Sequence, residues 1–180
     1  MVKNSNAHSI RMVESLKTVV GEEAAREFEE KYPLSKSADY NRKFKWAKEA
    51  SEYLDEKYDQ NTNIQIRENC ICNDGNSTAK IMLKCLDKTN SISEFVTRFN
   101  DTVNYASLEY LSDHKLLFCY PECYCGCVKR VDETLPPTWC YCTLGYTKSL
   151  FTKVFKKDVK VELIESIKMG NQRCAMSVEW

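Results

Sequence analysis

The 180-residue sequence has no long apolar run, no excess of charge of one sign and only two histidines. No stretch approaches the roughly 18 apolar residues that a membrane-spanning helix needs. The first residues contain no continuous apolar core with a small-residue cleavage site, so we predict no secretory signal and expect a cytoplasmic protein. Lysine plus arginine equals aspartate plus glutamate, at 26 each, so the overall charge provides no basic footprint for nucleic acid.

Histidine is scarce, and this limits the metal-binding and catalytic sites that the chain can form. His8 lies near a terminus that we expect to fray, and His114 lies in a predicted turn. Histidine-rich metal chemistry is therefore disfavoured. His114 is the one credible partner for a Cys–His catalytic pair, although the pattern favours a solvated turn residue over a base at this position. The CxxC spacing of common zinc knuckles is also absent, which argues against a zinc ribbon.

Cysteine, in contrast, is abundant. Six of the ten cysteines fall between residues 119 and 142, in the segments CYCGC and CYC and just before them, and Cys70 and Cys72 form a further CxC pair. Such density predicts a metal site, a redox site or a disulfide knot, and a reducing compartment disfavours the knot. An isolated cysteine such as Cys85 is expected to pack in the core instead.

The N-terminal half has the apolar spacing of helices. The predicted helices cover 8–31 with a break at Gly21, then 42–58, 77–87 and 91–103. The polar run 59–63 is expected to end the third of these helices. Residues 1–36 are predicted to form an N-terminal helical segment, and residues 37–180 a single α+β domain.

The C-terminal half has the signals of a sheet. Predicted strands cover 106–111 and 115–120 around a turn at 112–114, then 124–130, and finally 159–164 and 173–180 as a closing hairpin. A late helix is expected from the N-cap Thr138 to about Phe155. This order predicts an α+β fold, in which N-terminal helices and the late helix pack on an antiparallel sheet.

The predicted elements limit what the cysteines can do. In an extended segment, Cys123, Cys125 and Cys127 would point to one face and could share a metal ion only if the backbone turned, for example at Gly126. Cys140 would lie at the start of the late helix, where the helix dipole favours a thiolate. Such a thiolate can be a nucleophile, a redox thiol or a metal ligand.

The last third of the chain resembles the end of the 4-vinyl-reductase domain and the related aminothiazoline-carboxylate hydrolase-like proteins. The similarity rests on Cys140, Gly145-Tyr146, the strand 159–162 and the segment 170–174, and covers roughly residues 105–180. The resemblance implies a small-molecule-binding domain, usually dimeric, with an apolar pocket and a structural zinc. Cys140 and Cys174 match family positions, whereas Ser166 stands where that zinc site has a cysteine.

We therefore expect a small-molecule-binding or sensing domain with a thiolate-rich site, for zinc with iron left open, beside an apolar pocket. The predicted metal ligands are Cys123, Cys125, Cys127, Cys140, Cys142 and Cys174. The predicted pocket residues are Phe118, Tyr141, Tyr146 and Leu150. The ligand is expected to be apolar or aromatic, and the protein to be a homodimer that binds neither nucleic acid nor membrane. The alternatives are a hydrolase- or redox-type enzyme with Cys140 as nucleophile, and a structural protein whose cysteines only pack.

Overall fold

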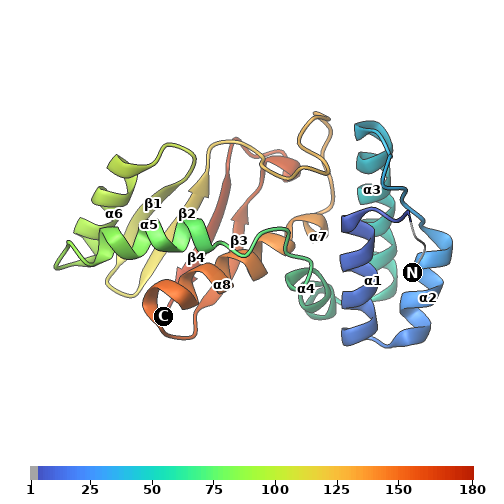
Figure 1. The fold of residues 1–180 in the computed structure, drawn as a ribbon, viewed down its shortest axis with the longest axis horizontal. Helices are drawn as coiled ribbons and strands as arrows, with labels where there is room; N and C mark the ends of the chain where they lie inside the picture. The colour runs from blue at the N-terminus through green and yellow to red at the C-terminus, as the bar shows by residue number, and fades with distance from the viewer. Residues whose placement is uncertain (1–3) are drawn as a thin grey trace. The chain divides into compact units, whose positions relative to one another are not determined.

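A computed structural model describes residues 4–180 of the chain (Figure 1). Within these residues the chain forms eight α-helices, one short 3-10 helix and one four-stranded antiparallel sheet. The predicted α+β class is confirmed. The chain divides into two compact units: unit 1 comprises the chain up to Cys72 together with Tyr124–Gly145, and unit 2 comprises Asn73–Cys123 and Tyr146–Trp180. The domain boundary predicted at residue 36 stays a prediction.

Unit 1 is helical. Its elements are α1 (Ala7–Val19), α2 (Glu22–Lys31), α3 (Tyr40–Lys57), α4 (Gln60–Glu68), α7 (Pro137–Cys140) and the first residues of α8 (Cys142–Phe155). Three of its helices begin with a side-chain cap, because Asn6, Asp39 and Asp59 each accept a hydrogen bond from a main-chain N–H of the first turn. Asp59 therefore starts a helix in the polar run that was predicted to end one.

Aromatic rings form the core of unit 1. Phe28 and Trp46 are fully buried, and their ring centres lie 6.2 Å apart in an edge-to-face arrangement. Trp46 in turn contacts Trp139 of α7, with ring centres 5.8 Å apart and planes at 90°. Edge-to-face pairs of this kind add stabilisation beyond the area that they bury. The rings thereby fix α7 against α3.

Unit 2 contains the sheet. Its elements are α5 (Asn76–Leu86), α6 (Ile92–Thr102), β1 (Ser107–Ser112), β2 (Lys115–Tyr120), most of α8, β3 (Lys160–Glu165), the 3-10 helix η1 (Ile167–Met169) and β4 (Cys174–Glu179). The strand order is β1-β2-β4-β3, and every neighbouring pair is antiparallel. The predicted hairpin around residues 112–114 and the closing hairpin of β3 and β4 are both present.

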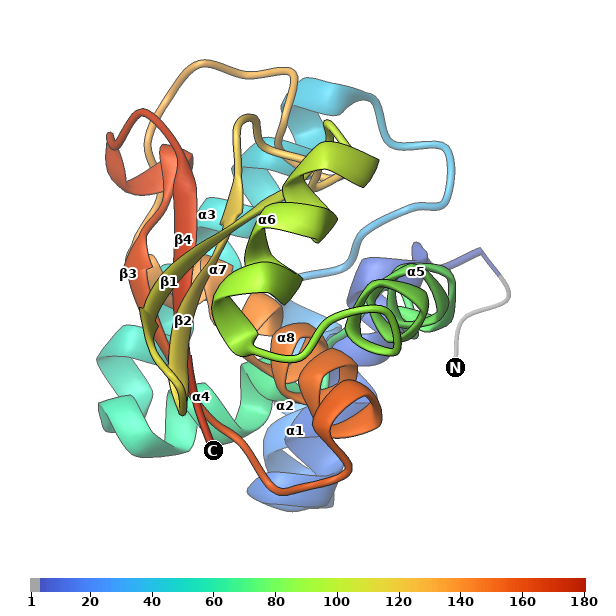
Figure 2. The same ribbon diagram turned by 90° about the vertical axis from the view of Figure 1, so that its left-hand side faces the viewer.

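Helices α6 and α8 lie on the same face of this sheet (Figure 2). The ring of Phe118 in β2 packs edge-to-face on Phe151 of α8, with centres 5.4 Å apart. Phe95 of α6 meets Phe155 of α8 at 6.2 Å. The late helix therefore packs on the sheet, as its apolar stripe predicted. No helix in the described part of the chain is long and apolar enough to cross a membrane.

Candidate functional site

Six cysteine thiols of unit 1 influence one another electrostatically, and we call them the thiol cluster. They are Cys70, Cys72, Cys125, Cys127, Cys140 and Cys142. Three separate segments supply them: the end of α4 with the loop after it, the turn at Cys125, and the junction of α7 and α8. All ten cysteines of the chain are thiols rather than halves of disulfides. Parts of both sulfur-bearing segments that the sequence singled out therefore belong to unit 1, whereas Cys123 belongs to unit 2, and their convergence at one site stays a prediction.

Arg67 of α4 lies among these thiols and is only 3% exposed. Its Nε donates to the main-chain oxygen of Thr138 at 3.3 Å, and its Nη2 donates to that of Trp139 at 2.7 Å. Burial opposes its charge, but the neighbouring thiols, Cys70 first among them, favour it, and the pKa of Arg67 is raised on balance. Within the described residues its partners are main-chain oxygens, the Trp139 ring and thiols, and none is a carboxylate.

Arg67 also explains why the predicted helix from Thr138 to Phe155 is wrong. The chain instead forms a four-residue helix, α7, and a new helix that starts at Cys142. In a continuous helix the carbonyls of Thr138 and Trp139 would accept from the N–H groups four residues later. Here both carbonyls bond Arg67, and Tyr141 N instead closes a tighter turn onto Thr138 O at 3.3 Å. Cys140 thus ends α7 and Cys142 begins α8.

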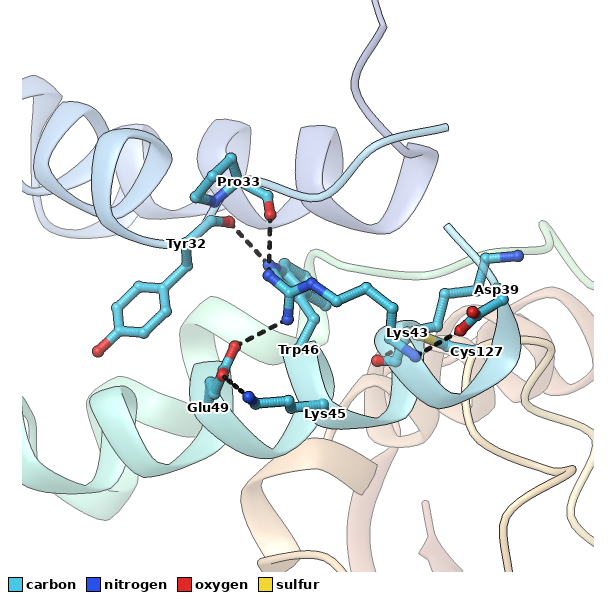
Figure 3. A network of polar contacts seen from close by, with 9 residues as sticks. Tyr32, Pro33, Asp39, Lys43, Lys45, Trp46, Glu49 and Cys127 are labelled. Carbon is cyan, nitrogen blue, oxygen red and sulfur yellow. Dashed lines mark hydrogen bonds and ion pairs between the residues drawn. The ribbon is translucent and has the colours of Figure 1, made fainter. Parts of the chain in front are cut away.

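The segment around Cys125 is a turn, so the strand predicted at 124–130 is wrong. The carbonyl oxygen of Cys125 accepts from both Val128 N at 3.1 Å and Lys129 N at 3.0 Å. This turn buries Cys127, whose thiol donates to the main-chain oxygen of Lys43 in α3 at 3.6 Å (Figure 3). Burial, followed by the neighbouring Cys125, raises the pKa of Cys127 to about 12. Cys127 is therefore a packed thiol rather than a reactive one.

A network of polar contacts fixes the start of helix α3, which supplies the Lys43 carbonyl that Cys127 contacts. Arg42 donates to Glu49 at 3.0 Å and to the main-chain oxygen of Pro33 at 3.2 Å, and Trp46 Nε1 donates to Tyr32 O at 2.8 Å (Figure 3). These bonds tie the start of α3 to the end of α2. The carbonyl that Cys127 bonds is therefore part of a fixed framework.

Cys72 is the exposed member of the thiol cluster. Arg11 Nη2 donates to its sulfur at 3.2 Å, and Nδ1 of His8 lies 3.8 Å from the same sulfur. Partial desolvation of the thiol raises the pKa of Cys72, and the charge of Arg11 opposes that rise. Burial, with help from Arg11, Arg67 and Lys43, lowers the pKa of His8 to about 4, so its imidazole is neutral at pH 7.

The other cysteines belong to unit 2. Cys85 and Cys119 are buried, and Cys123 and Cys174 are half-buried. Cys123 and Cys174, two of the predicted metal ligands, thus lie outside the unit that holds the other four. Among the predicted pocket residues, Phe118 and Leu150 are fully buried in unit 2, Tyr146 lies in unit 2, and the Tyr141 hydroxyl of unit 1 accepts from Gln60 at 3.2 Å. The pocket stays a prediction.

The prediction of a zinc site is wrong. Among residues 4–180, no group of three or more histidine, cysteine, aspartate or glutamate side chains is placed so that it could hold a metal ion. Zinc in proteins needs four ligands close to a tetrahedron, with sulfur about 2.3 Å from the metal. The buried guanidinium of Arg67 instead interacts electrostatically with four thiols of the thiol cluster, and a cation in that place disfavours a second one; the four are Cys70, Cys125, Cys140 and Cys142.

The family of the chain follows from a comparison with family models. The model of "Family of unknown function (DUF6144)" matches residues 1–179. The chain belongs to this family. The resemblance to 4-vinyl-reductase domains is therefore wrong, because the matching family is a different one and spans nearly the whole chain. The search of curated proteins finds no match.

The solved structures that match include H-NOX domains. One from Shewanella oneidensis in the Fe(II)CO ligation state is 13% identical, with 97% of each chain covered and a TM-score of 0.44. An Fe(II) unliganded mutant from K. algicida is 10% identical, with 97% of this chain and 95% of that chain covered, also at a TM-score of 0.44. Similarity at this level establishes neither a common fold nor a common ligand.

Three residues of the site escaped sequence reasoning: His8, Arg11 and Arg67. His8 is part of the first turn of α1, with its ring centre 6.4 Å from that of Trp139, and is not in a frayed terminus. Of these three residues, only Arg67 has a feature in the sequence that could have identified it. It follows Ile66 in a helical segment whose buried stripe it extends, and a charged residue in such a stripe indicates a buried partner.

Proposed function

We propose that unit 1 is a small-molecule-sensing module whose thiol cluster reacts with a small soft electrophile, the class that includes hydroperoxides. The observation that carries this proposal is a buried, charged Arg67 whose neighbours are four thiols and no carboxylate. A buried cation without an anionic partner is costly, and deprotonation of a neighbouring thiol supplies that partner. Burial raises the pKa of Cys70 and Cys142, and the charge of Arg67 opposes that rise, so Arg67 acts in favour of the thiolate, which is the nucleophilic form of cysteine.

Two hydrogen-bond donors on residues beside the thiol cluster are buried and unsatisfied among the described residues. The buried Nε1 of Trp139 and Nε of Arg11 have no hydrogen-bond partner within the described part of the chain. Trp139 carries the Arg67 guanidinium 4.3 Å from its ring centre, and Arg11 donates to Cys72 through another nitrogen. Buried donors normally find acceptors, so these two N–H groups favour a negatively charged sulfur or a polar adduct formed on it.

Stoichiometric capture fits this site better than turnover. General acid–base catalysis needs a group whose pKa lies near the working pH. His8 is the histidine beside the thiols, and burial lowers its pKa to about 4, so it accepts protons poorly at pH 7. Reaction of a thiol without a tuned base suits a sensor that responds once per oxidation or alkylation event.

The second candidate is an enzyme that uses Cys140 as its nucleophile. Cys140 is half-buried, and its charge is among those that raise the pKa of Arg67. If the protein is such an enzyme, an alkylating reagent should modify Cys140 alone, and the activity should fall in proportion to that modification. The sensor would instead react first at the exposed Cys72.

Competitive alkylation distinguishes these proposals. The full chain is treated with substoichiometric N-ethylmaleimide, and the modified cysteines are quantified by peptide mass spectrometry. We expect Cys72 to react before Cys174, the half-buried control thiol of unit 2. If Cys174 reacts as fast as any thiol of the cluster, the sensing proposal is overturned.

A matched pair of variants tests the role of Arg11. Arg11→Gln removes the charge beside Cys72 and should slow its alkylation by up to roughly fivefold, because an exposed charge pair contributes ~0.2–1 kcal/mol. Arg98→Gln, at an exposed position of α6 in unit 2, removes the same charge elsewhere and should leave the rate unchanged.

A further inference from the structure

We propose that Cys72 reacts preferentially with small disulfides that carry a carboxylate, and that Arg11 binds this carboxylate beside the thiol. This inference rests on the proposed function and specifies the substrate class of the same site. It follows from three features: the contacts that join Arg11 to Cys72 and His8, the unused hydrogen-bond donors of Arg11, and the contrast with an arginine that carboxylates occupy.

His8, Arg11 and Cys72 form a compact trio in unit 1. Arg11 Nη2 donates to the Cys72 sulfur at 3.2 Å and lies 3.3 Å from His8 Nδ1, and Nδ1 lies 3.8 Å from the same sulfur. Burial lowers the pKa of His8 to about 4, so its imidazole is neutral at pH 7 and can accept from Arg11. The guanidinium is therefore held beside an exposed thiol by a partner that does not neutralise it.

Within residues 4–180, most of the hydrogen-bond donors of Arg11 have no acceptor. A guanidinium offers five N–H groups, and both contacts of Arg11 use Nη2. Its Nε is buried without a partner, and no carboxylate of the described residues pairs with its Nη1. Carboxylates are the anions that match a guanidinium best, through charge-assisted hydrogen bonds. Arg11 therefore has both the charge and the free donors to receive one.

Arg173 of unit 2 is the opposite case. Its Nε and Nη2 donate to Glu165 at 3.2 Å and 3.1 Å, and its Nη1 donates to Glu109. Two carboxylates thus use all three nitrogens of this guanidinium, which directly precedes Cys174 in the sequence. An incoming anion would have to displace them. Of the two arginines, only the one beside Cys72 is free to bind a carboxylate.

A second unpartnered donor lies beside the trio. Trp139 is 2% exposed, its Nε1 has no hydrogen-bond partner within the described part of the chain, and its ring centre lies 6.4 Å from that of His8. The same indole carries the Arg67 guanidinium 4.3 Å from its ring centre, and the charge of Arg67 acts on the Cys72 thiol together with that of Arg11. Unsatisfied donors and two cations favour an anion here over a neutral or cationic group.

The reaction is thiol–disulfide exchange. The Cys72 thiolate attacks one sulfur of the small disulfide, a new S–S bond forms, and the old S–S bond breaks. The second half of the reagent leaves as a thiolate and takes up from solvent the proton that Cys72 lost. Cys72 is oxidised to a mixed disulfide and half of the reagent is reduced to a thiol, so the electrons balance.

The test uses three disulfides with the same two-carbon arms and different end groups: dithiodipropionate is anionic, bis(hydroxyethyl) disulfide is neutral, and cystamine is cationic. The full chain is treated with each at pH 7, and peptide mass spectrometry without reduction gives the rate at Cys72 relative to Cys174, the internal control. We expect the relative rate to fall from the anionic to the neutral and from the neutral to the cationic reagent. Each step should be roughly 1.5- to 5-fold, the range for an exposed charge pair.

Two further measurements assign this preference to Arg11. Arg11→Gln should bring the three relative rates close together, whereas Arg98→Gln, at an exposed position of unit 2, should keep the wild-type order. Raising the salt concentration from about 0.02 M to about 0.5 M should weaken the preference of the wild-type protein, because salt screens exposed charges. Circular dichroism shows that each variant is folded, and the salt series needs no variant at all.

The outcomes separate this inference from the function on which it rests. Equal relative rates for the three reagents, a preference for cystamine, or a preference that survives in Arg11→Gln overturns the inference. The sensing proposal then still stands if neutral N-ethylmaleimide modifies Cys72 before Cys174. If Cys174 reacts first with N-ethylmaleimide while Cys72 keeps an anionic preference that Arg11→Gln abolishes, the sensing proposal fails and this inference stands.

Discussion

Arg67 holds Trp139 twice, because its guanidinium carbon lies 4.3 Å from the centre of the indole ring while its Nη2 donates to the main-chain oxygen of the same residue at 2.7 Å. The ring contact is a cation–π interaction out of water, where such contacts are strongest. The hydrogen bond takes a carbonyl that α7 would otherwise use to continue into α8. One buried side chain therefore sets where α7 stops, and with it the positions of Cys140 and Cys142.

Arg67→Lys should destabilise unit 1 although it keeps the charge. Lysine cannot donate to two carbonyls in the fixed geometry of a guanidinium, and it stacks less well on an indole. We expect a loss of ~2–4 kcal/mol, from one charge-assisted hydrogen bond and one desolvated cation–π contact. Urea unfolding followed by tryptophan emission measures it, since Trp46 and Trp139 both lie in unit 1.

Arg98→Lys is the control for that experiment. Arg98 is exposed on α6 of unit 2, so its replacement should change the free energy of unfolding by less than ~0.5 kcal/mol. An Arg67→Lys protein as stable as this control would show that the two carbonyl bonds contribute nothing. In that case the break between α7 and α8 would need another cause.

His8 should make unit 1 less stable in mild acid. Burial first, and then the cations Arg11, Arg67 and Lys43, lower the pKa of His8 from 6.5 to about 4. The folded state therefore binds fewer protons at His8 than the unfolded state between these two values, so stability falls as the pH drops from about 6.5 to about 4. Above that window the contribution of His8 is constant.

The variant His8→Gln isolates this effect from other groups that titrate in the same range. Its free energy of unfolding should lose the part of the pH slope between 6.5 and 4 that belongs to His8, while the slope at lower pH remains. Urea unfolding at a series of pH values measures both proteins. Identical slopes in the two would mean that His8 is solvated and titrates normally.

The sequence predicted the parts of the fold that depend on residues close together in the chain. Ser91 caps α6 as the capping-box pattern predicted, with Glu94 N donating to Ser91 Oγ at 3.2 Å, but the Glu94 carboxylate accepts from Asn90 N rather than from Ser91 N. The hairpin of β1 and β2 and the closing hairpin needed only alternating apolar residues and a polar turn. Asp59 was misread because a polar run ends one helix as readily as it caps the next.

The site depends on contacts between distant parts of the chain, and the sequence pattern does not encode these. Arg67 reaches carbonyls 71 and 72 residues further along, and Arg11 reaches a sulfur 61 residues away. The density of cysteines along the chain predicted a zinc site, which is wrong, because nothing local showed that a buried arginine lies near these thiols. The cysteine-rich segments therefore suggested a metal ion, whereas the cation near these thiols in the fold is the guanidinium of Arg67.

Gly145→Ala should be strongly destabilising even though alanine normally favours a helix. Gly145 lies in α8, where Gly→Ala alone would stabilise by roughly 0.5–1 kcal/mol. A Cβ at this position, however, would overlap the main-chain oxygen of Glu68 and lie 2.7 Å from its carbonyl carbon and 2.9 Å from its Cα. Main chain cannot rotate away as a side chain can, so α4 and the start of α8 would have to separate.

We expect this clash to outweigh the helix preference, with a net loss of ~1–3 kcal/mol, as is usual when a close-packed contact is overfilled. Gly126→Ala is the matched control, because its Cβ would meet nothing within 4 Å and its φ is not positive. Thermal unfolding of the two variants beside the wild type measures the difference. A Gly145→Ala protein that unfolds no earlier than the Gly126→Ala control would show that α8 does not approach Glu68 closely in solution, and with that the placement of Cys142 beside Arg67 would lose its main support.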